Sequence, residues 1–127
     1  MKNETKDDMI LDIFIGGYGG PSKFYVIVKS DNRYLSKYSY SPYGRLPNPL
    51  NNDDFTVNER SKKEIYDFIN GLKEQTKFWE LSYNNENILD GTQWHINLNE
   101  QNTIYSGSNE FPSNWEDVVE YINKFFI

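Results

Sequence analysis

The sequence contains no cysteine, a single histidine and no long apolar run. Without cysteine the chain can form neither disulfides nor zinc–thiolate sites, and this composition fits a reducing cytoplasm. The first nine residues are charged and polar, so we expect a flexible tail over 1–8. The apolar run at 9–15 is interrupted by Asp12 and is too short for a signal-peptide core or a membrane span. We therefore expect a cytoplasmic domain that needs no metal, cofactor or membrane.

Basic residues are scarce in the second half of the chain. Residues 64–127 hold three Lys/Arg and eleven Asp/Glu, a net charge of −8, whereas residues 1–63 carry a net charge of +2. An acidic half argues against nucleic-acid binding, which needs clustered cations to neutralise phosphates. It suits a basic protein partner, and it equally suits ordinary solubilising charge.

Alternation and turn residues predict strands over 9–15, 24–29, 34–40, 94–98 and 103–106, and residues 78–81 are expected to enter another strand. The Asp31-Asn32 pair is expected to form a left-handed turn. Helices are expected behind two capping boxes, Ser61 to Glu64 and Ser113 to Glu116. Their core-facing stripes are Ile65, Phe68, Ile69 and Leu72 in the first helix, and Trp115, Val118, Val119, Ile122 and Phe125 in the second.

This pattern predicts one α+β domain over residues 1–127, in the order β-β-β-α-β-β-β-α. The sheet is expected to be mostly antiparallel with five to six strands, and both amphipathic helices are expected to pack on one face. A chain of this length buries about two-thirds of its unfolded surface, enough for a core without disulfides.

The segment IFIGGYGGPSKFYV, residues 13–26, carries four glycines around Tyr18. A dinucleotide-binding loop needs a third spaced glycine and a following helix, but Ser22 holds that position and a strand follows. Two interpretations remain. The glycines supply positive φ angles to a hairpin turn, or Gly17 and Gly19 flank a mobile Tyr18 that enters a partner's cleft.

Candidate catalytic groups are few. His95 is expected on the exposed or partly covered side of its strand, opposite the apolar alternation. Adjacent carboxylates occur at Asp53-Asp54 and Glu116-Asp117, but adjacent residues rarely face one bond as glycoside hydrolysis requires. Turn formation and the helix dipole account for these acids more simply.

A long loop over 41–54 contains three of the five prolines. Its Tyr43 and Arg45 are suited to grip a protein or a sugar ring, and its tyrosines are equally suited to cover the open side of the sheet.

The order of landmarks resembles small bacterial inhibitors of the emfourin type, which block thermolysin-like metalloproteases. The resemblance rests on a strand that runs into Gly16-Gly17-Tyr18-Gly19, a helix that ends near Phe78-Trp79, an Asp90-Gly91 turn before Trp94, and a closing helix from Trp115. It implies target contact at the glycine-rich loop. In size and acidity the chain also resembles the immunity proteins of bacteria and phages.

The leading hypothesis is a non-catalytic protein that inhibits a partner, as an inhibitor or immunity protein does. Its expected contact residues are Gly17, Tyr18, Gly19, Tyr43 and Arg45, with Glu116, Asp117 and Glu120 for electrostatic steering. The alternatives are a carbohydrate- or small-ligand-binding module that uses the tyrosine-rich sheet face, and a small hydrolase built on His95 and carboxylates.

Overall fold

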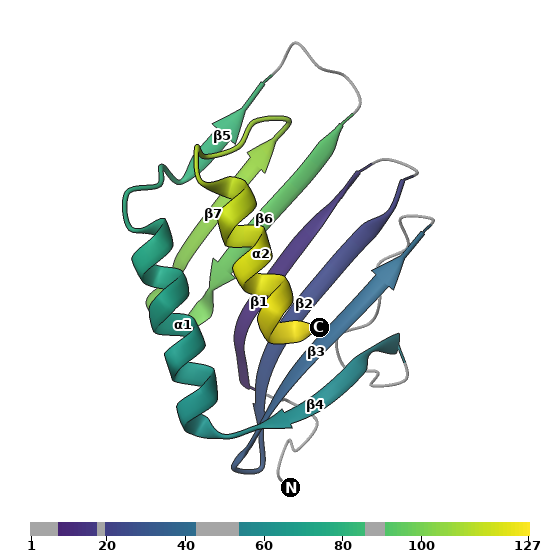
Figure 1. The fold of residues 1–127 in the computed structure, drawn as a ribbon, viewed down its shortest axis with the longest axis vertical. Coiled ribbons are helices and arrows are strands. Elements are labelled where there is room, and N and C mark those ends of the chain that lie inside the picture. The colour runs from purple at the N-terminus through teal and green to yellow at the C-terminus, as the bar shows by residue number, and fades with distance from the viewer. Residues whose placement is uncertain (1–7, 18–19, 43–53, 86–90) are drawn as a thin grey trace, which may run out of the picture.

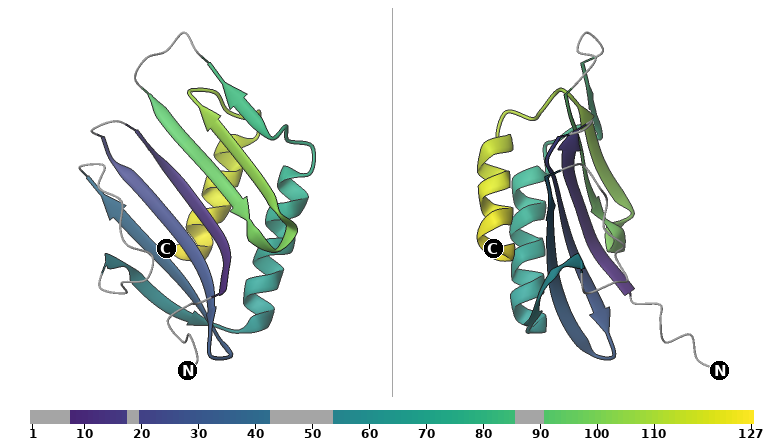
Figure 2. Two further views of the ribbon diagram at one scale, coloured as in Figure 1. Left: turned by 180° about the vertical axis from the view of Figure 1, so that it is seen from behind. Right: turned by 90° about the vertical axis from the view of Figure 1, so that its right-hand side faces the viewer.

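Both helices lie on the same face of one seven-stranded sheet (Figure 1, Figure 2). The computed structural model describes residues 8–17, 20–42, 54–85 and 91–127. Four of the expected contact residues, Tyr18, Gly19, Tyr43 and Arg45, lie outside these ranges, as do nearly all of the expected tail and most of the 41–54 loop.

The strands run β4-β3-β2-β1-β6-β7-β5 across the sheet. Their bounds are β1 Asp8–Gly17, β2 Ser22–Ser30, β3 Arg33–Ser41, β4 Thr56–Arg60, β5 Ser82–Asn84, β6 Thr92–Leu98 and β7 Thr103–Ser108. The helices are α1 (Lys62–Thr76) and α2 (Trp115–Phe126), and a 3₁₀ turn, η2 (Asn99–Gln101), joins β6 to β7. In the part of the chain that is described, neither helix has the length and apolar character needed to cross a membrane.

The α+β class and the mostly antiparallel sheet are confirmed, but the described residues form seven strands, above the predicted five to six. The additional strand is β4, which pairs with β3 at the edge of the sheet and falls just after the expected loop. Its sequence, TVNER, is short and mostly polar, as is typical of an edge strand. One pair, β5 with β7, is parallel.

The β2–β3 hairpin turns as the sequence predicts. Asp31 and Asn32 have φ angles of 50° and 66°, the left-handed conformation that these residue types tolerate. The turn fixes the register in which Ser30 faces Arg33.

Only one of the two predicted capping boxes forms. At α1, the Ser61 hydroxyl accepts from the Glu64 amide, and the Glu64 carboxylate accepts from the Ser61 amide. At α2, the prediction of a Ser113 to Glu116 box is wrong: Asn114 is the N-cap residue and makes no side-chain capping bond. Its side chain instead accepts from Trp79 Nε1 at 2.7 Å and donates to the Gln75 carbonyl at 2.8 Å, so it ties the start of α2 to the end of α1.

The main core lies between the sheet and the helices. All four predicted stripe residues of α1 are buried, and α2 buries Val118, Ile122 and Phe126. The three tryptophans meet at the start of α2, where the Trp94 and Trp115 ring centroids are 4.6 Å apart and Trp79 packs against both.

The strand expected to begin within residues 78–81 begins directly after them, as β5 at Ser82. Phe78 is 89% exposed in this connection, whereas Trp79 turns inward to the tryptophan cluster. The aromatic and apolar residues that suggested a strand are therefore divided between solvent and core in an irregular segment.

Candidate functional site

The glycine-rich segment joins β1 to β2 in an antiparallel hairpin, as the sequence predicts. Close packing requires Gly16 and Gly17, whereas a Cβ at Gly20 would meet open space. The expectation that these glycines supply positive φ is wrong for Gly16, Gly17 and Gly20, none of which has a left-handed φ. A Cβ at Gly17 would lie 2.6 Å from the Gly91 carbonyl oxygen, and one at Gly16 would lie 2.3 Å from Ser22 Oγ. A side chain at either position would therefore clash with its neighbours.

A cavity of about 430 Å³ lies beside this hairpin, and we call it the turn cavity. Its lining combines the ends of three strands with the first two turns of α2: Ile15, Gly16, Gly17, Gly20, Pro21, Lys23, Gly91, Thr92, Trp115 and Val119.

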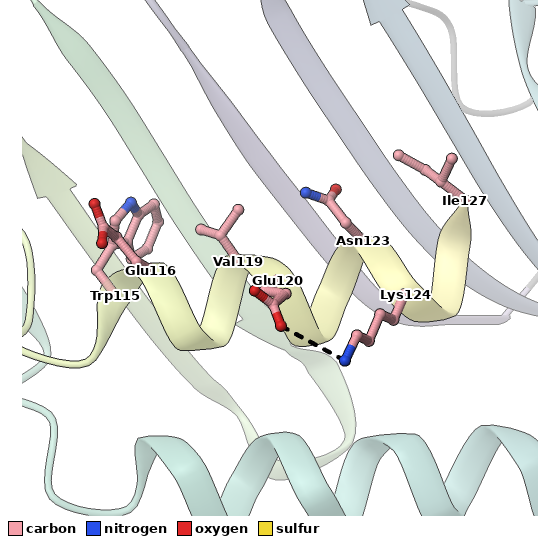
Figure 3. A pocket seen from close by; sticks show the side chains of 7 residues that line it. All are labelled: Trp115, Glu116, Val119, Glu120, Asn123, Lys124 and Ile127. Carbon is pink, nitrogen blue, oxygen red and sulfur yellow. Dashed lines mark ion pairs between the residues drawn. The ribbon is translucent and has the colours of Figure 1, made fainter.

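The exposed side of α2 forms a second hollow of about 670 Å³, which we call the α2 groove (Figure 3). Its lining is Trp115, Glu116, Val119, Glu120, Asn123, Lys124 and Ile127. These residues form two rows of every fourth residue. An apolar-to-amide row runs from Trp115 to Ile127 through Val119 and Asn123, and a charged row runs from Glu116 to Lys124 through Glu120.

The turn cavity and the α2 groove share Trp115 and Val119. The fold therefore places Gly17 in one of these adjoining cavities and Glu116 and Glu120 in the other, although about 100 positions of sequence separate them. Asp117 is exposed on α2 but lines neither cavity. Sequence reasoning placed Val119 in the core stripe, whereas it is half-buried at the junction of the two cavities.

The charged row carries more acid than base. Glu120 pairs with Lys124 at 3.5 Å, and both side chains are more than 70% exposed, so the pair contributes little to stability (Figure 3). Among the described residues, neither Glu116 nor Asp117 has an ion-pair partner.

The row that contains Asn123 is anchored from below by the sheet. The Tyr25 hydroxyl donates to Asn123 Oδ1 at 2.7 Å, and Tyr25 is fully buried beneath α2. Burial, and secondarily the neighbouring Tyr38, raise the pKa of Tyr25 far above its usual value, so it stays a neutral hydrogen-bond donor.

The tyrosine-lined face of β3 is mostly covered. Tyr34 packs edge-on against Tyr66 of α1, and Tyr38 packs against Tyr25 at 5.1 Å between centroids. Tyr40, at the end of the strand, is 51% exposed. The described part of this face is therefore not an open platform for stacking sugar rings.

His95 lies on the face of the sheet opposite the helices, as expected from its alternation with Trp94 and Ile96. Its Nε2 is 3.0 Å from Asp12 Oδ2, and its ring stacks on Phe14 at 5.9 Å. Asp12 was not a predicted site residue. Its only signal was a carboxylate within an apolar strand, and the register that places it beside His95 was not visible in the sequence.

The His95 ring borders a polar depression of about 580 Å³ over β5, β6 and β7, which we call the outer depression. It is lined by Phe14, Ser82, Tyr83, Asn84, Gln93, Trp94, His95, Ser106, Gly107 and Ser108. Ser106 is the cross-strand neighbour of His95, but no serine hydroxyl in the described residues hydrogen-bonds to the imidazole.

Within the described ranges, no three His, Asp or Glu side chains come together as a metal site would require. The arrangement at α2 instead offers an apolar strip bordered by carboxylates, which suits contact with another macromolecule. No protein-family model, curated protein or solved structure matches this chain, so its own residues carry the functional argument.

Proposed function

We propose that this chain is a non-catalytic protein-binding protein that acts in the cytoplasm and neutralises a partner enzyme or toxin, as inhibitors and immunity proteins do. The observation that supports it is the junction of the glycine-rich hairpin with the acidic side of α2 through Trp115 and Val119. This junction joins two segments that each favour protein contact into one surface, with aromatic and apolar residues at its centre and charges at its rim.

The shape of the surface supports a macromolecular partner over a small ligand. All seven residues that line the α2 groove come from one side of α2 and the residue that follows it. A hollow with one wall cannot enclose most of a small molecule, as ligand pockets do. It can form the centre of a larger interface.

The test uses the full chain as immobilised bait in lysate of the native host, followed by an activity assay of whatever binds in stoichiometric amount. We expect one partner whose enzymatic or toxic activity falls when the chain is added. A variant with Tyr18→Ala, Glu116→Ala and Glu120→Ala is expected to lose this partner, because it removes a predicted anchor and both groove carboxylates. The absence of a stoichiometric partner, or undiminished binding by the variant, contradicts the proposal.

A small hydrolase is the second candidate, because His95 and Asp12 converge within hydrogen-bond distance beside the outer depression. Asp12 could orient the imidazole so that its Nδ1 accepts a proton from water or from Ser106. An ester-hydrolysis screen decides this candidate. Turnover that disappears in both His95→Ala and Asp12→Asn supports it, and turnover that is absent or unchanged in these variants rejects it.

A further inference from the structure

The two rows on α2 define what the α2 groove can bind. The row of Trp115, Val119 and Ile127 offers apolar surface, and Ile127 is 74% exposed. The neighbouring row begins with two carboxylates one helical turn apart, Glu116 and Glu120. Like charges at this spacing repel each other, so a cation placed between them relieves the repulsion.

The helix dipole explains only part of this acidity. Glu116 lies in the first turn of α2, where a carboxylate is favoured by the N-terminal amides. Glu120 lies one turn further along, where that effect has faded. Its described ion-pair partner is Lys124 of the same helix, in an exposed contact that another cation can replace at little cost.

We propose that the α2 groove holds a basic and partly apolar segment of the partner protein. This inference rests on the proposed protein-binding function and specifies the chemistry of the partner. The segment's apolar side chains lie against Val119 and Ile127, and its Lys or Arg side chains pair with Glu116 and Glu120. Two carboxylates along an apolar strip disfavour phosphates and acidic segments through repulsion and unpaired burial.

The proposal predicts opposite effects on binding for the two members of the Glu120–Lys124 ion pair. Because Lys124 pairs with Glu120 in the free protein, it competes with the cation of the incoming segment. Removing Lys124 should therefore strengthen binding, whereas removing Glu120 should weaken it. A purely structural role of this ion pair would make both substitutions act in the same direction.

The probe is a display library of random peptides of about 12 residues, long enough to follow α2 along its length whether helical or extended. The library is panned on the full chain, and the enriched peptides are synthesised and their dissociation constants measured. We expect enriched peptides to combine Lys or Arg with apolar residues. No enrichment, or enrichment of acidic or uncharged peptides, overturns the proposal.

The variants locate the binding. Ile127→Asn replaces the exposed apolar side chain with an uncharged polar one of similar size and is expected to weaken binding about tenfold, with Val119→Thr as a second variant at the half-buried position. Glu120→Gln should weaken binding about two- to fivefold and Lys124→Gln should strengthen it by a similar factor. Their matched controls, Glu74→Gln and Lys77→Gln at the end of α1, change the net charge equally at an exposed ion pair that does not line the groove and should leave binding unchanged.

Unchanged binding in both Ile127→Asn and Glu120→Gln overturns the inference, as does weaker binding in Lys124→Gln. If the host partner binds with full affinity to these variants, the proposed function stands and the inference about the groove is wrong. If no host partner exists, the proposed function itself fails.

Discussion

The two sides of α2 are built from similar residues but have different neighbours. On the side toward α1, Phe68 stacks on Phe125 at 4.3 Å and on Tyr121 at 5.1 Å, and the Tyr121 hydroxyl donates to the Phe68 carbonyl. On the opposite side, Trp115 still packs in the tryptophan cluster, but Val119 is only half-buried and Ile127 is 74% exposed. The comparison separates a closed side, which packs against α1, from an open side, which the other described elements leave partly exposed.

The largest expected difference between the two sides is the loss of stability when a side chain is truncated. Phe68→Ala empties the centre of the closed side and should lower the free energy of unfolding by about 3–5 kcal/mol. Val119→Ala, on the open side, should cost less than about 1 kcal/mol, because its side chain is only half-buried. Urea denaturation followed by circular dichroism measures both. Equal losses would show that the groove side is also packed.

The sequence predicted the buried residues of α2 well, and its error lies on the open side of the helix. Helical periodicity identified Val118 and Ile122 correctly because both are buried in the main core. It also assigned Val119 to the core, since a period of 3.6 residues cannot show where the neighbouring element ends. The Asp12–His95 pair was missed for a similar reason, because it depends on how β1 and β6 align across 83 residues of sequence.

The failed capping box leads to a second prediction. Asn114→Ala removes the acceptor of the Trp79 indole and the donor to the Gln75 carbonyl, and should cost about 1–3 kcal/mol. Ser113→Ala should change stability by less than about 0.5 kcal/mol, because Ser113 is exposed and the N-cap position belongs to its neighbour. Thermal and urea unfolding compare the two variants. A larger loss of stability in Ser113→Ala than in Asn114→Ala would instead support the capping box that the sequence predicted.

The smallest expected effect concerns Tyr66 of α1, which packs edge-on against Tyr34 of β3. Burial, followed by its hydrogen bond to Glu100, raises the pKa of Tyr66 from 10.0 to about 12. The folded state therefore keeps the phenol proton to higher pH than the unfolded state does. Its contribution to stability is complete below pH 10 and is lost as the pH rises from about 10 to 12.

Tyr66→Phe lacks this proton, so its stability should fall less steeply than that of the wild type across the same interval. Urea midpoints measured at several alkaline pH values give the two slopes, and the other buried tyrosines contribute equally to both proteins. Identical slopes would mean that the Tyr66 hydroxyl titrates alike in the folded and unfolded states. The exposed hydrogen bond between Tyr66 and Glu100 would then add nothing to stability, and α1 would be held in place only by the residues that face α2 and the sheet.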